Sequence, residues 1–142
     1  GADLVLDSVN NIIENKINLK PQINTSNLNS ANKLNKENCK IEWTMKASKV
    51  YNMIRGLSPY PGAHCFLVHK KETLKIIIYS SKIEIETHQL NNGQIIIEKK
   101  QIKIATTDGF IIPQEIKVQG KKRMSVSDLM NGFKFDLDSK FI

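Results

Sequence analysis

Positively charged side chains are the residues of this sequence with the clearest chemical potential. Arg55 stands at the end of a predicted helix, and three adjacent cations follow Gly120. A guanidinium can bind a phosphate through two parallel hydrogen bonds, whereas an ammonium acts as a mobile point charge. Because adjacent like charges repel, such a run favours a polyanionic partner. The residues from which we expect phosphate contacts are Lys33, Lys36, Lys40, Arg55, Lys121, Lys122 and Arg123.

Each of these groups also has a purely structural explanation. The lysines of residues 33–40 could belong to an ordinary solvated linker. Arg55 could instead cap its helix or pair with a carboxylate. The run of cations at 121–123 could serve solubility alone. Further lysines could extend one basic face, although the sequence does not show whether they lie together: Lys75, Lys99, Lys100 and Lys103.

Nucleophilic, acid–base and metal-binding side chains form no recognisable site. His64, His69 and His88 fall in predicted strands or loops, and none belongs to a paired motif. Cys39 and Cys65 lack metal-ligand spacing such as Cys-x-x-Cys, so we expect free thiols and no zinc. We therefore predict no catalytic and no metal-binding residue in this chain.

The charge distribution favours a polyanionic partner. The 142 residues carry a net charge of +7, but residues 33–123 alone carry +9. A region this basic has a positive field that attracts polyanions. No apolar run approaches the ~20 residues that span a bilayer, and no signal peptide is visible. With only two cysteines, we expect a cytoplasmic protein that does not contact a membrane.

Two helices and a linker are predicted before the strands. Apolar residues on one helical stripe predict an amphipathic helix over residues 2–16, whose lone apolar face normally packs on something larger. Pro21 and an asparagine-rich stretch at 24–32 indicate a linker. A second helix is predicted over residues 48–57, because Gly56 is typical of a helix end and Pro59 and Pro61 prevent its continuation.

From residue 62 onward the pattern changes to strands. Apolar or alternating runs predict strands at 63–68, 74–79, 82–87, 94–97, 101–106, 110–112 and 116–119. Asn92-Gly93 is a hairpin signal, and Asp108-Gly109 is another tight-turn pair. Short strands joined by glycine turns favour a small antiparallel barrel.

Three aromatic residues could stack on bases or belong to the core. For Trp43 and Phe110 the core is favoured. Tyr60 stands between two prolines, and we expect it to pack beneath that turn rather than to stack.

Several motifs resemble the C-terminal domain of methionyl-tRNA formyltransferases. Residues 54–63 read Ile-Arg-Gly-Leu-Ser-Pro-Tyr-Pro-Gly-Ala, which is similar to that family's Ile-Arg-Gly-Leu-x-Pro-x-Pro-Gly-Ala. Residues 120–124 resemble its Gly-Lys-x-x-Met, and residues 125–132 its final Ser-x-x-Asp-Leu-x-Asn-Gly helix. Lys-Leu-x-Lys-Glu at 33–37 and Ile-Glu-Trp at 41–43 resemble its linker. A Pro-Gln pair at 21–22 resembles the residues after its catalytic domain.

The resemblance implies a mainly β fold, an OB-like barrel with a preceding helix and a short C-terminal helix. It implies that residues 1–20 are the last helix of an N-terminal α/β catalytic domain, 21–42 the linker and 43–142 the tRNA-binding domain. The parent would transfer a formyl group from 10-formyltetrahydrofolate to initiator methionyl-tRNA. The family's His-x-Ser-Leu-Leu-Pro motif does not occur here, so this part is expected to be inactive and to bind no cofactor.

The implied partners are tRNA and the chain's own N-terminal catalytic domain, and a monomer is expected. Two alternatives stay open. The chain could be the related domain of another formyltetrahydrofolate-dependent enzyme, acting on a nucleotide sugar or in folate metabolism. It could also be a free-standing OB-fold module that binds nucleic acid. The strong basic charge argues against the first, and the lone N-terminal helix argues against the second.

Overall fold

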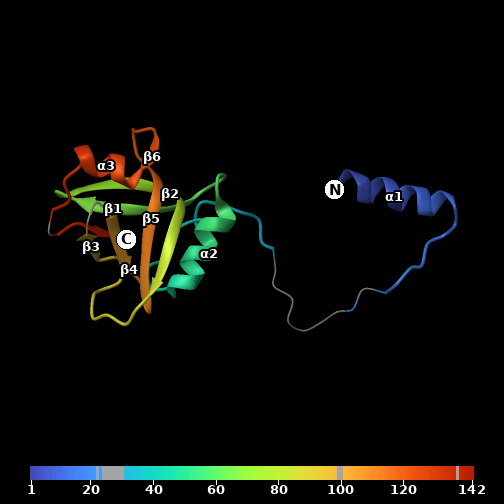
Figure 1. Ribbon diagram of the computed structural model, residues 1–142, viewed down its shortest axis with the longest axis horizontal. Coiled ribbons are helices and arrows are strands. Elements are labelled where there is room, and N and C mark those ends of the chain that lie inside the picture. Colours follow the sequence, from blue (N-terminus) through green and yellow to red (C-terminus); the bar gives the residue numbers. More distant parts are fainter. Residues whose placement is uncertain (22, 24–30, 99–100, 137) are drawn as a thin grey trace. The chain divides into compact units, whose positions relative to one another are not determined.

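The computed structural model describes residues 1–21, 23, 31–98, 101–136 and 138–142. They form two compact units, Gly1–Asn32 and Lys33–Ile142, each described here by itself. Figure 1 shows both units. Most of the predicted asparagine-rich linker, Gln22 of the Pro-Gln pair, and Lys99 and Lys100 lie outside the described residues.

The first unit contains helix α1, Ala2–Ile13. The helix ends before the predicted Lys16 because Asn15 adopts a left-handed conformation, with φ of 54°. That backbone geometry cannot continue a right-handed helix. No residue of α1 is buried within its unit, so the apolar stripe predicted from the sequence is exposed.

The second unit begins with a folded segment at 33–41 and then helix α2, Ala47–Leu57. The N-terminus of α2 is capped from far along the chain, because the Ala47 N–H donates a 2.7 Å hydrogen bond to Asp108 Oδ1. Apolar residues at helical spacing bury one face of α2 against the sheet. They are Ala47, Val50, Ile54 and Leu57.

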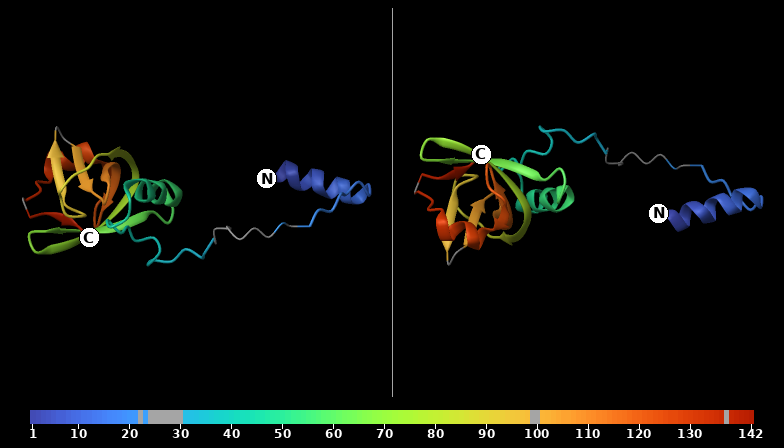
Figure 2. Two further views of the ribbon diagram at one scale, coloured as in Figure 1. Left: turned by 90° about the horizontal axis from the view of Figure 1, so that it is seen from below. Right: turned by 90° about the horizontal axis from the view of Figure 1, so that it is seen from above.

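Seven antiparallel strands form one curled sheet (Figure 2). Their bounds are β1 Ala63–His69, β2 Glu72–Ile85, β3 Ile95–Glu98, β4 Gln101–Ala105, β5 Gly109–Val118, β6 Arg123–Ser125 and β7 Lys140–Phe141. The strand order is β3-β4-β5-β2-β1-β7, with β6 paired to β5 beside this path. A mainly β fold with a small barrel is confirmed.

The two edges of the sheet meet next to Gly93. Gln94, just before β3, forms an antiparallel bridge with Lys140 of β7. The Phe141 N–H also donates a 2.8 Å hydrogen bond to the Gly93 carbonyl. Gly93 has φ of 81°, and a Cβ there would collide with the Phe141 carbonyl oxygen. Only glycine fits this closure without a shift of the backbone.

Two features of the strand prediction were wrong. Strand β2 is one long strand, although the sequence predicted two separate strands there, at 74–79 and 82–87. Strand β5 likewise replaces two predicted strands, at 110–112 and 116–119. The two long strands pair with each other, and their register shifts near Ser80. Asn92-Gly93 does not join two paired strands, since β3 pairs with β4 rather than with β2. The predicted turn at Asp108-Gly109 does connect the paired strands β4 and β5.

Helix α3, Val126–Gly132, follows β6 as predicted. Ser125 caps its N-terminus, because the Ser125 Oγ accepts a 3.0 Å hydrogen bond from the Asp128 N–H. The burial of Trp43 and Phe110 confirms their core assignment. The core is one cluster that joins α2, α3 and the sheet.

Candidate nucleic-acid interface

Residues 33–41 form an ordered turn against the barrel rather than an extended tether. Asn35 and Asn38 each donate a backbone N–H to the side-chain oxygen of the other, both at 2.8 Å. Asn38 also donates its amide to the Lys33 carbonyl. Buried Cys39 and Ile41 fix the end of the turn in the core. The predicted phosphate-binding lysines of this segment are exposed on a defined scaffold: Lys33, Lys36 and Lys40.

The proline turn at 58–62 holds an exposed aromatic ring. Gly62 lies against the sheet, where an added Cβ would come within 2.6 Å of the Ile77 side chain. With its glycine against the sheet, the turn presents Tyr60 to solvent, and 89% of this residue is exposed. The expectation that Tyr60 packs beneath the turn was therefore wrong.

The ordered turn and the proline turn meet at one groove. The groove has a volume of 370 Å³. Lys36 enters it from the first segment, Tyr60 from the second, and Lys75 from β2. Leu34 and Pro61 add apolar surface. The site thus combines an exposed aromatic ring with two ammonium groups, a combination that suits nucleotides.

Strand register extends the positive charge beyond the groove. Lys117 of β5 lies opposite Ile77 of β2 and opposite Arg123 of β6. Directly opposed residues share a face of a sheet, as do residues two apart on one strand. Lys75, Lys117 and Arg123 therefore lie on one face.

The hairpin turn between β5 and β6 adjoins the same face. The Gln119 N–H donates a 2.8 Å hydrogen bond to the Lys75 carbonyl, and the Lys75 N–H donates to Gln119 Oε1 at 3.2 Å. Lys121 and Lys122 follow directly and are exposed. On the other side, Lys40 Nζ lies 5.8 Å from the Phe66 ring, and Phe66 pairs with Lys75. We call this set the basic face: Lys36, Lys40, Lys75, Lys117, Lys121, Lys122 and Arg123.

Arg123 is already neutralised, unlike its lysine neighbours. Its Nε and Nη2 donate to the two carboxylate oxygens of Glu115, both at 2.6 Å. The guanidinium also lies over the Tyr79 ring, 4.2 Å from its centre. The hydrogen bonds to Arg123 lower the pKa of Glu115, so the pair stays charged. Any phosphate at Arg123 must compete with this carboxylate.

Lys103 does not contribute free charge. Its Nζ lies 2.9 Å from Glu84 and 3.6 Å from Glu98, and its side chain is mostly buried. The hydrogen bond to Glu84 raises the pKa of Lys103. Among the described residues, the lysines of the basic face form no such ion pair.

Arg55 lies apart from the groove, on the exposed side of α2. Its Nη2 donates a 3.4 Å hydrogen bond to Asn52, and it forms no ion pair with a described carboxylate. It lines a second pocket, together with residues of β2. Among the described residues, Arg55 makes neither of the structural contacts considered from the sequence, a carboxylate pair or a bond to the last carbonyls of α2.

The histidines have structural surroundings. His88 accepts a hydrogen bond from the Leu90 N–H and donates Nε2 to the Gly109 carbonyl. His69 Nδ1 lies 3.0 Å from Ser139 Oγ. Buried His64 borders the groove, and desolvation, reinforced by Lys75 and Lys40, lowers its pKa. Within the described part of the chain, no three His, Cys, Asp or Glu residues gather into a metal site.

The sequence did not identify Lys117 or the exposure of Tyr60 as parts of this surface. The alternation Glu115-Ile116-Lys117-Val118 carried a signal for Lys117, because a strand with buried even positions exposes the odd ones. No comparable signal was available for Tyr60, whose exposure depends on how Gly62 meets another strand.

The fold and these motifs define a class of protein. Residues 33–134 match the family described as formyl transferase, C-terminal domain, and the chain belongs to this family. The match begins at Lys33, where the second compact unit begins.

Curated relatives narrow the resemblance to methionyl-tRNA formyltransferases. The enzyme of this name from Flavobacterium johnsoniae is 44% identical over 140 residues, which cover 99% of this chain and 44% of the relative. That from Bacteroides thetaiotaomicron is 37% identical over 139 residues, covering 94% of this chain and 43% of the relative. The chain therefore spans less than half the length of these relatives.

Solved structures agree on the fold. A variant of HypX from Aquifex aeolicus matches with a TM-score of 0.58 and 16% identity, over 94% of this chain and 24% of that one. Likeness at this level of identity shows the fold alone. No helix in the described part of this chain is long and apolar enough to cross a membrane.

Proposed function

We propose that this chain is the tRNA-binding C-terminal part of a methionyl-tRNA formyltransferase. In such an enzyme it would hold tRNA so that the aminoacyl end reaches a catalytic domain. Contacts to phosphate and sugar position a nucleic acid without reading its sequence. The names of the curated relatives support the enzyme class, and the basic face supports the role of this part.

The observation that carries the proposal is the groove between the ordered turn and the proline turn. Lys36 and Lys75 flank it without described carboxylate partners, and Tyr60 stands exposed at its rim. Lysines release counterions from a phosphate backbone, whereas an aromatic ring stacks on unpaired bases of any sequence. A site for a neutral or cationic small molecule would need neither.

We place formyl transfer itself outside this chain. The donor in this family, 10-formyltetrahydrofolate, needs a site in which catalytic side chains converge. The described residues do not fit that need. His69 and His88 are held by structural hydrogen bonds, the buried His64 has two lysines and no carboxylate beside it in the groove, and burial raises the pKa of the Cys65 thiol. Neither the groove nor the Arg55 pocket contains a carboxylate.

The exposed apolar stripe of α1 fits the same proposal. Leu4 and Ile13 are more than two-thirds exposed within their unit. Burying such a stripe is favourable, by roughly 25 cal/mol for each Å² of apolar surface. We propose that α1 packs against the catalytic domain of the parent enzyme, which acts in the cytoplasm.

The test is tRNA binding by fluorescence anisotropy over a series of salt concentrations. We expect a Kd on the order of 10⁻⁴–10⁻⁶ M at physiological salt, with strong salt dependence. The double variant Lys121→Ala/Lys122→Ala should weaken binding and reduce the salt slope by about two phosphate contacts.

Lys70→Ala/Lys71→Ala is the matched control, because it removes two adjacent lysines from a different hairpin turn. It should change binding much less. If the wild-type chain bound no tRNA even at low salt, the proposal would fail. The related domain of a formyltransferase acting on small molecules would then be the better assignment.

A further inference from the structure

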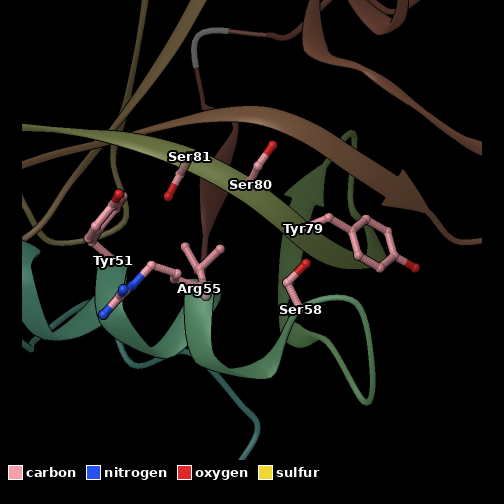
Figure 3. A pocket seen from close by; sticks show the side chains of 7 residues that line it. Tyr51, Arg55, Ser58, Tyr79, Ser80 and Ser81 are labelled. Atoms are coloured by element: carbon pink, nitrogen blue, oxygen red, sulfur yellow. The ribbon is translucent and has the colours of Figure 1, made fainter.

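A pocket between α2 and β2 has no role in the groove described above. It has a volume of 270 Å³. Ser58, at the start of the proline turn, forms part of its wall. Figure 3 shows the residues that line it, which are Tyr51, Ile54, Arg55, Ser58, Tyr79, Ser80 and Ser81.

The irregularity in β2 positions one side chain of this pocket. Ile78 pairs with Ile116, Ser80 with Glu115, and the register shifts again before Ser81. Such bulges redirect side chains and occur often beside functional sites. In Figure 3, Ser81 points to the side of the strand that faces α2, whereas Ser80 points away.

Ser81 has an unusual environment for a hydroxyl group. Its Oγ is buried, and no hydrogen-bond partner lies within reach among the described residues. Buried polar groups are almost always hydrogen-bonded, and the exceptions call for an explanation such as a bound ion. A buried hydroxyl on the pocket side of the strand, without a described partner, can hydrogen-bond to an oxygen-bearing ligand that enters the pocket.

The charge of the pocket indicates an anion. Arg55 brings a guanidinium whose described polar contact is the 3.4 Å bond to Asn52, and no carboxylate lines the pocket. Tyr51 and Ser58 add hydroxyl groups. Guanidinium and hydroxyl groups are all hydrogen-bond donors that suit an anion.

We propose that this pocket binds one phosphate group, and that in the complex with tRNA it takes a phosphodiester of the RNA backbone. Arg55 supplies the charge and Ser81 a buried hydrogen bond. A water molecule occupies about 30 Å³ in the liquid, so the pocket has room for a phosphate with its waters. The assignment of RNA as the source rests on the proposed function.

Two variants of the full chain test the site by removing charge and hydrogen bonding separately. Arg55→Ala should weaken tRNA binding about tenfold and reduce the salt slope by about one contact. Ser81→Ala should weaken binding about threefold and leave the slope unchanged, because it removes no charge. Circular dichroism and thermal unfolding would verify that both variants fold.

The matched control is Lys49→Ala, which removes one exposed positive charge from the same helix but does not line the pocket. It should change affinity less than twofold. Equal effects of Arg55→Ala and Lys49→Ala would overturn the proposal, because they would mean that α2 acts only through its general field.

Inorganic phosphate separates the two sources of the anion. In ¹⁵N–¹H NMR spectra, millimolar phosphate should shift the amide signals of Ser80 and Ser81 in wild type but not in Arg55→Ala. Such shifts together with unchanged tRNA affinity of Arg55→Ala would overturn the RNA assignment and leave a free-anion site. If the wild-type chain bound tRNA but showed no phosphate-induced shifts, and Arg55→Ala kept full tRNA affinity, the phosphate site would be rejected and the proposed function would stand. A wild-type chain that bound no tRNA would reject both proposals.

Discussion

Two regions of the barrel carry lysines and differ in what surrounds the charge. Beside the groove, Lys36 and Lys75 form no ion pair with a described residue. On β4, Lys103 lies between Glu84 and Glu98, and its side chain is only 17% exposed. The lysines beside the groove can release counterions when they bind phosphates. Lys103 is already paired with two carboxylates of the protein. Net charge alone therefore overstates the surface that is available to a polyanion.

The largest expected effect comes from replacing unpaired lysines, compared with replacing lysines that are already paired with carboxylates. Lys36→Ala/Lys75→Ala should weaken tRNA binding on the order of 30-fold and lower the salt slope by about two contacts. Lys16→Ala/Lys103→Ala removes the same charge from residues that are paired with Glu14 and Glu84, and should change affinity about twofold. Anisotropy titrations of both variants compare them. Equal losses would show that only the overall field matters.

Tyr60→Ala tests whether the groove offers more than charge. Base–aromatic stacking contributes about 1–3 kcal/mol, so affinity should fall about tenfold with an unchanged salt slope. The thermal midpoint should not change, since 89% of Tyr60 is exposed. Tyr60→Phe keeps the ring and should bind like wild type. A reduced slope in Tyr60→Ala would indicate instead that the turn had moved the lysines.

Glu115→Gln should convert a paired cation into a free one. Without the carboxylate, Arg123 becomes available on the basic face, and tRNA affinity should rise about threefold with a slope steeper by about one contact. Gln keeps the shape of Glu, which makes it the conservative change. Weaker binding would mean that Glu115 positions Arg123 productively. The variant Glu115→Gln/Arg123→Ala should cancel the gain.

The smallest effect concerns pH. The pKa of His64 is lowered by burial and by Lys75 and Lys40, so a polyanion that neutralises these lysines should raise it. Binding then takes up protons, and affinity should increase about twofold as pH falls from about 7.5 to 5.5. His64→Gln should abolish this dependence. An equal pH response in His64→Gln would assign it to other groups.

Stability should move in the opposite direction. The folded protein holds the pKa of His64 below its usual 6.5, so the unfolded chain binds the proton more readily. The contribution of His64 to stability is complete above pH 6.5 and is lost as the pH falls from there toward the lowered value. Urea denaturation of wild type and His64→Gln at pH 7.5 and 5.5 would measure this difference.

Local patterns predicted the elements of the fold well. The apolar spacing in α2 and the turn at Asp108-Gly109 both act over a few residues, and each is found in place. The division of β2 into two strands failed because Ser80 and Ser81 resemble a polar break. Pairing with β5 carries the strand through this irregularity instead.

The candidate site was predictable only in part. The lysine-bearing segments could be named from the sequence, but the partner of each cation depends on long-range geometry. Nothing local distinguishes Arg123, which meets Glu115 across a hairpin, from Arg55, which meets no described carboxylate. The groove itself forms only because residues 34–39 and 60–64 fold against Lys75.

The way in which the barrel closes bears on how the chain folds during synthesis. The Ile142 N–H donates to the Phe66 carbonyl, and the Phe66 N–H donates to the Ile142 carbonyl. The Phe141 N–H donates to the Gly93 carbonyl. One edge of strand β1 pairs with β2, but its other edge pairs with β7, which lies over 70 residues later in the chain. On the ribosome the sheet cannot close until residues 140–142 have left the exit tunnel. We expect the open edges of β1 and β3 to be exposed until then, a stage at which nascent chains are prone to aggregate.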